Sequence, residues 1–332
     1  MRKEGFMKVA ELENDILVVK TRENETLNGR TGAIVKVLGC GLCGSDIVKL
    51  KQHLVKNGTV LGHEIVAQIV EINSATNFKV DDVIVTSHHI PCGKCEYCKN
   101  GNVSMCRHFK ETNIRPGGFS ELVYVSEEHL QNVAYLKPQN LTNIEASFYE
   151  PLGCCVRAVK RAGLKENSTA LVIGLGSVGI LMAQALKAFG MNVIGCDLIS
   201  SRVELLKNLG IEAFRVPEMC DSIKADGVFM TSGADKAIDT ALKFVRDGGK
   251  ILVFSSTPNN FGYANNEIYY RELTVLGSYS PSPADLRDSL NLLANKEVKV
   301  QGLSTEYPLE KVQKSINDTV ENKIMKAYIK IN

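Results

Sequence analysis

Two different patterns of hydrophobic and polar positions divide the chain near Pro151. Before this residue, short runs rich in Val and Ile alternate with turns that contain Gly, Asn and Asp. Such runs are typical of strands separated by turns. We expect a β-rich domain with strands at residues 32–39, 64–72, 81–87 and 119–126.

After Pro151 the pattern predicts strands that alternate with helices. Apolar runs at 170–173, 192–197, 227–232, 250–256 and 273–279 read as buried strands. A long helix follows the first of them, and amphipathic patterns predict helices at 201–210 and 234–249, each with a glycine stop. This alternation predicts an α/β fold with a doubly wound parallel sheet covered on both faces.

The final segment predicts a return to the first domain. Residues 283–300 contain a helical pattern, and residues 327–331 read as a short strand. We therefore expect one domain from residues 1–150 and 286–332, and a second domain from residues 151–285.

Composition and charge exclude several classes of partner. The chain has 332 residues, a formal net charge of +2 and no basic tract, which excludes nucleic acid and anionic membranes as expected partners. No apolar run reaches the roughly 18 residues that a membrane span needs, and charges interrupt the start where a signal peptide has its apolar core. We expect a cytoplasmic protein, in which ten cysteines need a reason other than disulfides. Four of them lie scattered among apolar residues, and we interpret these as small buried hydrophobes: Cys154, Cys155, Cys196 and Cys220.

A glycine motif follows the first strand of the second domain. Residues 174–179 read Gly-Leu-Gly-Ser-Val-Gly, between an apolar strand and a helix. In such a dinucleotide-binding turn, Gly174 permits the tight bend, Gly176 lets the backbone approach a pyrophosphate, and Gly179 lets the helix pack on the strand. The helix N-terminus, at Ser177 and Val178, offers N–H groups and a partial positive charge to the phosphates.

An acidic residue closes the next strand. Asp197 lies eighteen residues beyond Gly179. A carboxylate at this place accepts the ribose hydroxyls of NAD and repels the 2′-phosphate of NADP. Arg202, five residues further on, keeps some tolerance of NADP open. We expect NAD(H) as the cofactor, with NADP less favoured.

A loop in the first domain holds four cysteines. Cys92, Cys95, Cys98 and Cys106 form a C-x2-C-x2-C-x7-C motif. Four thiolates at such spacing suit a tetrahedral Zn²⁺ site. The bacterial ferredoxin motif has its fourth cysteine directly before Pro, whereas Cys106 precedes Arg107. Because four sulfur ligands leave no open position, we expect this zinc to be structural.

A sparser set of candidate ligands lies upstream of that loop. Cys43 follows a glycine-rich turn, and His63 and Glu64 come twenty residues later. A thiolate, an imidazole and a carboxylate together are typical of a catalytic zinc site with an open position. A single cysteine is more often a core residue, and a His–Glu pair is more often at the surface, so spacing alone leaves these readings open.

The order of the motifs resembles that of zinc-dependent medium-chain alcohol dehydrogenases. The stretches GLCGSD, GHE, the four-cysteine loop, GGFSE, EPL and GLGSVG occur in the family's order, and the sorbitol and threonine dehydrogenase branch is the most similar. The resemblance covers nearly the whole chain. It implies a GroES-like β-rich catalytic domain, an inserted Rossmann domain, two zinc ions per chain, and a homodimer or homotetramer.

The resemblance also implies a role for individual residues. Cys43 and His63 match ligands of the catalytic zinc, and Glu64 matches a ligand of the polyol-type branch. Glu150 matches an acid that either ligates the zinc or holds its water. In the same comparison, Asp46 matches a residue that holds the His63 ring, and Ser45 matches a hydroxyl that passes the substrate proton onward.

One position departs from the family's pattern. Many relatives have a proton-relaying histidine two residues after the acid that corresponds to Asp46, and this chain has Val48 there. His53 is the nearest later histidine and a weak substitute. His88, four residues before Cys92, is either a solvated histidine at a strand end or a residue that contacts the substrate.

The predicted function is a reversible hydride transfer between a secondary alcohol or polyol and NAD, with zinc as Lewis acid. A threonine-type amino-alcohol dehydrogenase is an alternative with the same chemistry. A non-catalytic zinc module that senses NADH is an alternative from another class. The sequence does not specify which small-molecule alcohol or ketone is the substrate.

Overall fold

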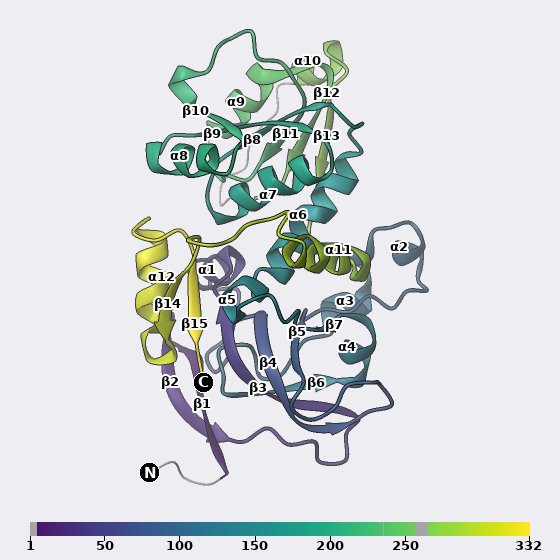
Figure 1. Ribbon diagram of the computed structural model, residues 1–332, viewed down its shortest axis with the longest axis vertical. Helices are drawn as coiled ribbons and strands as arrows, with labels where there is room; N and C mark the ends of the chain where they lie inside the picture. Colours follow the sequence, from purple (N-terminus) through teal and green to yellow (C-terminus); the bar gives the residue numbers. More distant parts are fainter. Residues whose placement is uncertain (1–4, 235, 256–264) are drawn as a thin grey trace. The chain divides into compact units, whose positions relative to one another are not determined.

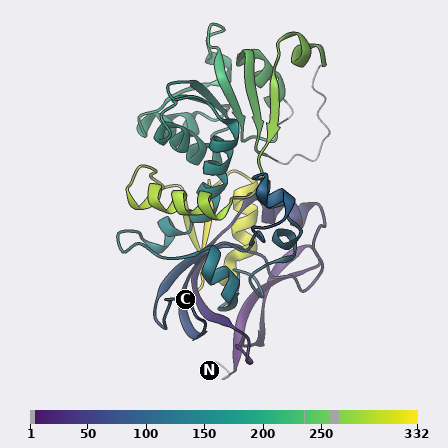
Figure 2. The ribbon, with the colours of Figure 1, turned by 90° about the vertical axis from the view of Figure 1, so that its right-hand side faces the viewer.

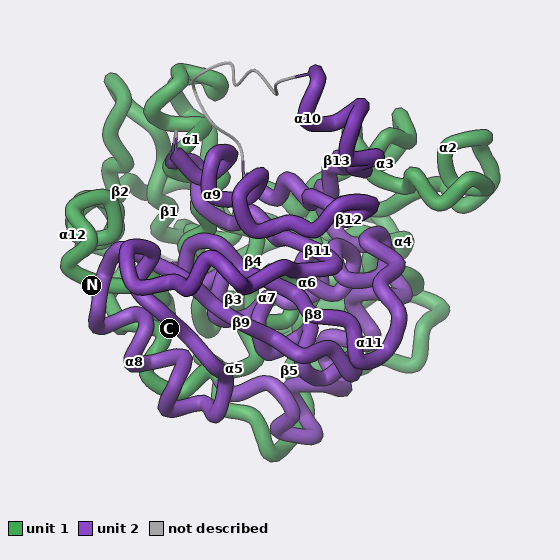
Figure 3. Tube along the Cα trace, turned by 90° about the horizontal axis from the view of Figure 1, so that it is seen from above, with its two compact units in different colours: residues 1–151, 300–332 green, residues 152–299 purple. Residues whose placement is uncertain are grey.

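The computed structural model describes residues 5–234, 236–255 and 265–332, and the chain forms two compact units (Figures 1 and 3). Unit 1 comprises Met1–Pro151 and Val300–Asn332, and unit 2 comprises Leu152–Lys299. Helix α6 (Tyr149–Ala162) begins in unit 1 and continues into unit 2. Residues 235 and 256, which belong to a predicted helix and a predicted strand, lie outside the described residues.

Unit 1 is built on two sheets. Strands β1 (Phe6–Glu13) and β2 (Ile16–Glu23) form an antiparallel hairpin that the sequence pattern missed. The larger sheet has the order β14-β15-β3-β4-β5-β7, with β6 paired to β3. Its strands are β3 (Gly32–Gly41), β4 (Glu64–Asn73), β5 (Val83–Thr86), β6 (Leu122–Ser126), β7 (Ala134–Leu136), β14 (Thr305–Pro308) and β15 (Ala327–Lys330). The four strands predicted here correspond to β3, β4, β5 and β6.

Short helices surround these sheets. They are α1 (Gly44–Lys51), α2 (Glu96–Lys99), α3 (Arg107–Glu111), α4 (Glu127–Asn132), α5 (Asn143–Ala146) and α12 (Val312–Val320), with 3₁₀ helices at Val103–Met105 and Leu309–Lys311. The apolar core lies between the two sheets and α12, and includes Val35, Ile69 and Phe119.

The last strand returns to the first unit. β15 pairs antiparallel with β3, with Tyr328 opposite Gly41 and Ile329 opposite Cys40. The expected return of residues 327–331 is therefore present. This pairing places the residues just before β15 next to the end of β3, where the loop that carries Cys43 begins.

Unit 2 contains a parallel sheet of six strands in the order β10-β9-β8-β11-β12-β13. They are β8 (Thr169–Ile173), β9 (Asn192–Asp197), β10 (Glu212–Arg215), β11 (Ala225–Met230), β12 (Val245–Val253) and β13 (Thr274–Gly277). Helices α7 (Ser177–Ala188) and α8 (Ser200–Asn208) cover one face, and α9 (Ala237–Phe244) covers the other (Figures 1 and 2). The remaining helices are α10 (Asn265–Tyr270), α11 (Pro283–Ala294) and a 3₁₀ turn at Val216–Glu218. The predicted doubly wound sheet is confirmed, with the strand order of a dinucleotide-binding fold.

Two boundaries differ from the sequence expectation. The helix expected at 234–249 ends at Phe244, because the chain is already extended at Val245, where β12 begins. Unit 2 extends to Lys299, whereas the sequence places the return at residue 286. The reason is α11, which packs on α6 through the ion pair of Lys160 Nζ with Asp285 Oδ1 at 2.9 Å. Among the described residues, no helix has both the length and the apolar character that crossing a membrane requires.

Candidate active site

The register of β3 against β4 brings the two sparse motifs together. Gly41, at the end of β3, lies opposite Glu64, the first residue of β4. Cys43 follows two residues after Gly41 and caps the N-terminus of α1. His63 directly precedes Glu64 in the sequence. Strand pairing, rather than sequence proximity, therefore joins the loop at residue 43 to residues 63 and 64.

Cys43, His63 and Glu64 form a group of candidate metal ligands. One ligand atom of each residue lies within 4.8 Å of the others. His63 and Glu64 are buried, and Cys43 is partly exposed. A thiolate, an imidazole and a carboxylate that converge in this way suit zinc, whose bonds to these ligands are about 2.0 to 2.3 Å long. The described residues thus include a donor set that fits a mixed zinc site.

Glycine at position 41 is required by the position of Glu64. A Cβ atom placed on Gly41 would lie 1.9 Å from Glu64 Oε2. The carboxylate therefore uses the space that any other residue would fill, and the sheet can pair here only because Gly41 has no side chain.

Asp46 lies beside the His63 ring. Its Oδ1 atom is 3.4 Å from His63 Nδ1, and both residues are buried. Burial favours the neutral imidazole, but the nearby Asp46 and Cys43 raise the pKa of His63 well above its usual range. Burial likewise raises the pKa of Asp46, but the charge of His63 outweighs it and lowers that pKa overall. Asp46 is thus positioned to orient the ring, as metal-bound histidines usually require.

Lys326 is a buried cation in this group that the sequence analysis missed. Its Nζ donates to Glu64 Oε1 at 2.9 Å and lies 2.6 Å from Glu64 Oε2. It also donates to the carbonyl oxygen of Leu42 at 3.0 Å. Burial disfavours the charged form of Lys326, but Glu64, with smaller contributions from Cys43 and Glu150, raises its pKa overall. Glu150 itself is buried in the first turn of α6. No motif marks a lysine that precedes a short apolar strand, so no sequence signal pointed to this residue.

The proton-relay candidates have different surroundings. Ser45 is exposed at the start of α1, and Val48 lies in the middle of that helix, partly buried. His53 is exposed, and its Nδ1 atom lies 2.8 Å from Asp15 Oδ1. His53 is therefore engaged in a hydrogen bond with Asp15 at the surface.

His88 is buried, so it is not a solvated residue at a strand end. Its ring centroid lies 4.4 Å from that of His63 and 3.8 Å from that of His89. Burial holds the pKa of His88 well below its usual value, so the ring is neutral near pH 7. The three rings form a row that starts at a candidate metal ligand.

The four cysteines of the loop also converge. Cys98 Sγ lies 3.5 Å from Cys95 Sγ and 4.0 Å from Cys92 Sγ, and Cys106 completes the cluster. A tetrahedral site with Zn–S bonds of about 2.3 Å has S···S edges of about 3.8 Å. These separations fit a zinc site and are about twice the length of a disulfide bond.

The glycine turn of unit 2 has the geometry that its motif demands. Gly174 has φ +92°, and a Cβ on Gly179 would lie 1.8 Å from the carbonyl oxygen of Gly174. A Cβ on Gly176 would meet nothing within 4 Å, so this backbone is open to a ligand. Helix α7 begins at Ser177, and Ser177 and Val178 are partly exposed.

Asp197 ends β9 and is tied to the glycine turn. Its Oδ2 atom accepts the backbone N–H of Leu175 at 2.6 Å, and its Oδ1 accepts that of Ile199 at 2.9 Å. Arg202 Nη1 lies 3.6 Å from Asp197 Oδ2. The acid predicted to select the ribose is therefore fixed by the same turn that is predicted to hold the pyrophosphate.

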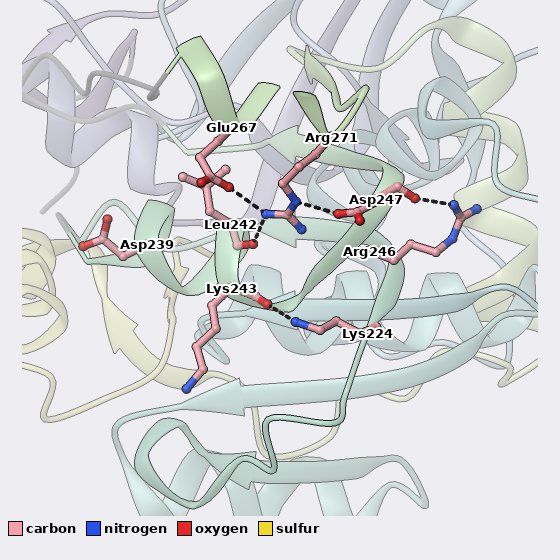
Figure 4. A pocket seen from close by; sticks show the side chains of 8 residues that line it. All are labelled: Lys224, Asp239, Leu242, Lys243, Arg246, Asp247, Glu267 and Arg271. Atoms are coloured by element: carbon pink, nitrogen blue, oxygen red, sulfur yellow. Dashed lines mark hydrogen bonds and ion pairs between the residues drawn. The ribbon is translucent and has the colours of Figure 1, made fainter. Parts of the chain in front are cut away.

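A separate pocket of about 770 Å³ lies in unit 2 at the amino ends of β11 and β12, away from the glycine turn at the carboxyl end of β8 (Figure 4). Several of its charged groups are engaged with one another or with neighbouring groups. Arg271 pairs with Asp247 at 2.7 Å and with Glu267 at 3.0 Å. Lys224 donates to the carbonyl oxygen of Lys243 at 2.7 Å. We regard this pocket as a surface ion-pair network.

Family models match both units. The model "Alcohol dehydrogenase GroES-like domain" matches residues 29–135, and the model "Zinc-binding dehydrogenase" matches residues 177–295.

Curated relatives match over nearly the whole length. The sorbitol dehydrogenase of Halalkalibacterium halodurans is 30% identical over 326 residues, which are 92% of this chain and 93% of that protein. The D-arabitol-phosphate dehydrogenase of Enterococcus avium is 30% identical over 321 residues, 90% of each chain. A solved structure described as a zinc-binding dehydrogenase from Sinorhizobium meliloti 1021, bound to NADP, is 25% identical with a TM-score of 0.87, and the match covers 98% of this chain and 99% of that one.

Proposed function

Because the chain belongs to the zinc-dependent medium-chain alcohol dehydrogenase family, in its sorbitol dehydrogenase-like branch, we propose that it transfers a hydride reversibly between a secondary alcohol or polyol and NAD. The observation that carries the proposal is the convergence of Cys43, His63 and Glu64 beside Asp46 in the GroES-like unit. The Rossmann unit contributes the glycine turn and Asp197. The enzyme class is that of the relatives, and the polyol substrate and the residue roles are our proposal.

We propose that Cys43, His63 and Glu64 hold the catalytic zinc and that Glu150 lies beside it. Zinc bound there supplies a Lewis acid that lowers the pKa of a substrate hydroxyl. Asp46 keeps the His63 ring in the orientation that leaves its other nitrogen free for the metal. Ser45, exposed at the start of α1, takes the hydroxyl proton and passes it to water. Since Val48 cannot relay a proton, this route ends in solvent rather than at a histidine on α1.

We propose NAD(H) as the preferred cofactor, bound at the turn of residues 174–179. The N–H groups at Gly176, Ser177 and Val178 face the pyrophosphate, and Asp197 accepts the ribose hydroxyls. Arg202 is the group that would tolerate a 2′-phosphate, because it already lies 3.6 Å from Asp197. NADP is therefore expected to bind more weakly than NAD.

The four-cysteine loop is proposed to hold a structural zinc through Cys92, Cys95, Cys98 and Cys106. We place the protein in the cytoplasm because the ten cysteines, all of which lie among the described residues, form no disulfide. We also propose a homodimer or homotetramer. β13 is an edge strand of the parallel sheet, and Tyr269, Tyr270 and Tyr279 near it are exposed, which is typical of an interface.

A substrate panel tests the reaction. The purified protein is assayed with polyols, diols and amino alcohols, each with NAD and with NADP, and with the matching ketones and NADH. Turnover of polyols or diols supports the proposal, and preferred turnover of amino alcohols supports the threonine-type alternative. The absence of turnover with every substrate, together with one zinc per chain, would indicate the non-catalytic module.

A further inference from the structure

Lys326 is the most deeply buried lysine side chain near the candidate metal ligands. It is 5% exposed and precedes β15, so the pairing of β15 with β3 fixes its backbone. Its ammonium group lies 2.9 Å and 2.6 Å from the two oxygens of Glu64. A third contact, to the carbonyl oxygen of Leu42, is 3.0 Å long.

These contacts make Lys326 and Glu64 a buried ion pair. Taking a lysine and a glutamate out of water is costly, and the pair persists only if the partners satisfy each other closely. Glu64 has no freedom to retreat into the sheet, because its Oε2 atom already occupies the space opposite Gly41. Lys326 therefore contacts the same carboxylate atoms that a metal ion at this site needs as ligands.

We propose that Lys326 competes with zinc for Glu64 and so sets the zinc affinity of the catalytic site. The inference rests on the proposed function, in which Cys43, His63 and Glu64 bind the metal. A zinc ion that uses a Glu64 oxygen lies about 2 Å from it, so two cations share one carboxylate. Because the ammonium group holds both carboxylate oxygens, Glu64 has less negative charge to offer the metal, and Lys326 keeps Glu64 neutralised when the metal leaves.

The competition has two measurable consequences. Removing the ammonium group releases Glu64 to the metal, so zinc at this site binds at least tenfold more tightly. The same removal leaves a buried carboxylate unpaired in the zinc-depleted protein, which therefore unfolds at a lower temperature. Zinc must then raise the melting temperature more in the variant than in the wild type.

The experiment measures zinc retention against a chromophoric chelator, with the full-length holoprotein and free Zn²⁺ as the only added ligand. Lys326→Met is compared with Lys330→Met, which removes the same charge four residues later from an exposed side chain of β15. We expect Lys326→Met to hold the chelatable zinc at least tenfold more tightly and Lys330→Met to match the wild type. Unchanged or weaker binding in Lys326→Met would overturn the inference.

The same substitution in a Glu64→Gln background tests whether Lys326 acts on the metal through the Glu64 carboxylate. Lys326→Met is expected to have little further effect there, because the shared carboxylate is gone. An equal gain in that background would show that Lys326 acts on the metal by charge alone, and would overturn competition. If Lys326→Met does not fold, the zinc affinities of Glu64→Gln and Cys43→Ser are compared instead. Competition predicts that Glu64→Gln loses less than tenfold in zinc affinity, whereas Cys43→Ser loses more than a hundredfold. A comparable loss in both would refute it.

Zinc content of the wild type separates the two proposals. Two zinc ions per chain with one readily chelated supports the catalytic site, and the variants then test Lys326 alone. One zinc per chain would overturn both the site and the inference.

Discussion

Two glycines three residues apart are expected to respond to the same substitution in opposite ways. In Gly179→Ala, the new Cβ lies 1.8 Å from the carbonyl oxygen of Gly174, far inside an ordinary contact of at least 3.4 Å. Helix α7 must move away from the turn by about 1.5 Å, and such overpacking costs about 3 kcal/mol. We expect the melting temperature to fall by roughly 10 °C.

In Gly176→Ala, the methyl group meets no protein atom within 4 Å, and φ is −66°, which alanine adopts freely. The weaker helix cap and the gain from a less flexible unfolded chain nearly cancel, so stability changes by less than about 1 kcal/mol. The methyl group nevertheless fills the space through which a pyrophosphate approaches the backbone. NADH affinity should fall at least tenfold.

NADH binding is measured by titrating the protein into NADH and following the fluorescence of NADH itself. Energy transfer from tryptophan cannot be used, because the chain has no tryptophan. Thermal melting of the same samples gives the stability. The expected result is lost NADH binding with normal stability in Gly176→Ala, and lost stability in Gly179→Ala. Normal NADH affinity in Gly176→Ala would refute the assignment of this turn to the cofactor, and normal melting of Gly179→Ala would refute the packing argument.

Four further substitutions test the candidate metal sites and the histidine row. Cys43→Ser should lower kcat by at least a thousandfold, while NADH binding measured by fluorescence stays normal. Cys106→Ser should instead lower the melting temperature and release the tightly held zinc. Equal effects of the two substitutions would contradict the division into a catalytic and a structural site. Asp46→Asn removes the charge beside His63 and should weaken retention of the chelatable zinc by about 10- to 100-fold, measured by chelator competition; unchanged retention would show that the carboxylate does not orient the ring. Burial lowers the pKa of His89 to about 4, so as the pH falls the unfolded chain binds a proton at this residue before the folded chain does. The folded state therefore loses about 2 kcal/mol of stability as the pH falls from 7 to 5. Denaturant unfolding should show a smaller loss in His89→Gln, and an equal loss would contradict the low pKa of His89 in the folded chain.

Local motifs made the Rossmann unit largely predictable. The glycine turn, the strand before it and the acid that ends the next strand are adjacent in sequence, and the chemistry of each depends on neighbours a few residues away. Strand β9 ends at Asp197, as predicted. The end of α9 was missed because residues 245–249 fit either a final helical turn or the start of a strand, and pairing with β11 decides for the strand.

The candidate metal site was only partly predictable, because its parts meet through sheet register. Cys43 and His63 stood out by residue type, but their proximity depends on Gly41 pairing with Glu64. Lys326 comes from the other end of the chain and carries no motif. Cys220, which the sequence suggests as a small buried hydrophobe, is instead exposed, with its Sγ atom 2.9 Å from Ser222 Oγ. An isolated cysteine in an apolar stretch does not reveal which face of the chain it occupies.

The return of β15 to β3 has a consequence for the order of events during synthesis. The ribosome completes residues 152–299 before β15 emerges, so the Rossmann unit, whose residues are contiguous, can fold while the first unit still lacks a strand. Lys326 meets Leu42 across 284 residues of chain. A nascent chain therefore exposes Cys43 and Glu64 at an unfinished sheet edge until translation is almost over. Premature termination before residue 326 leaves the candidate metal site without its internal cation.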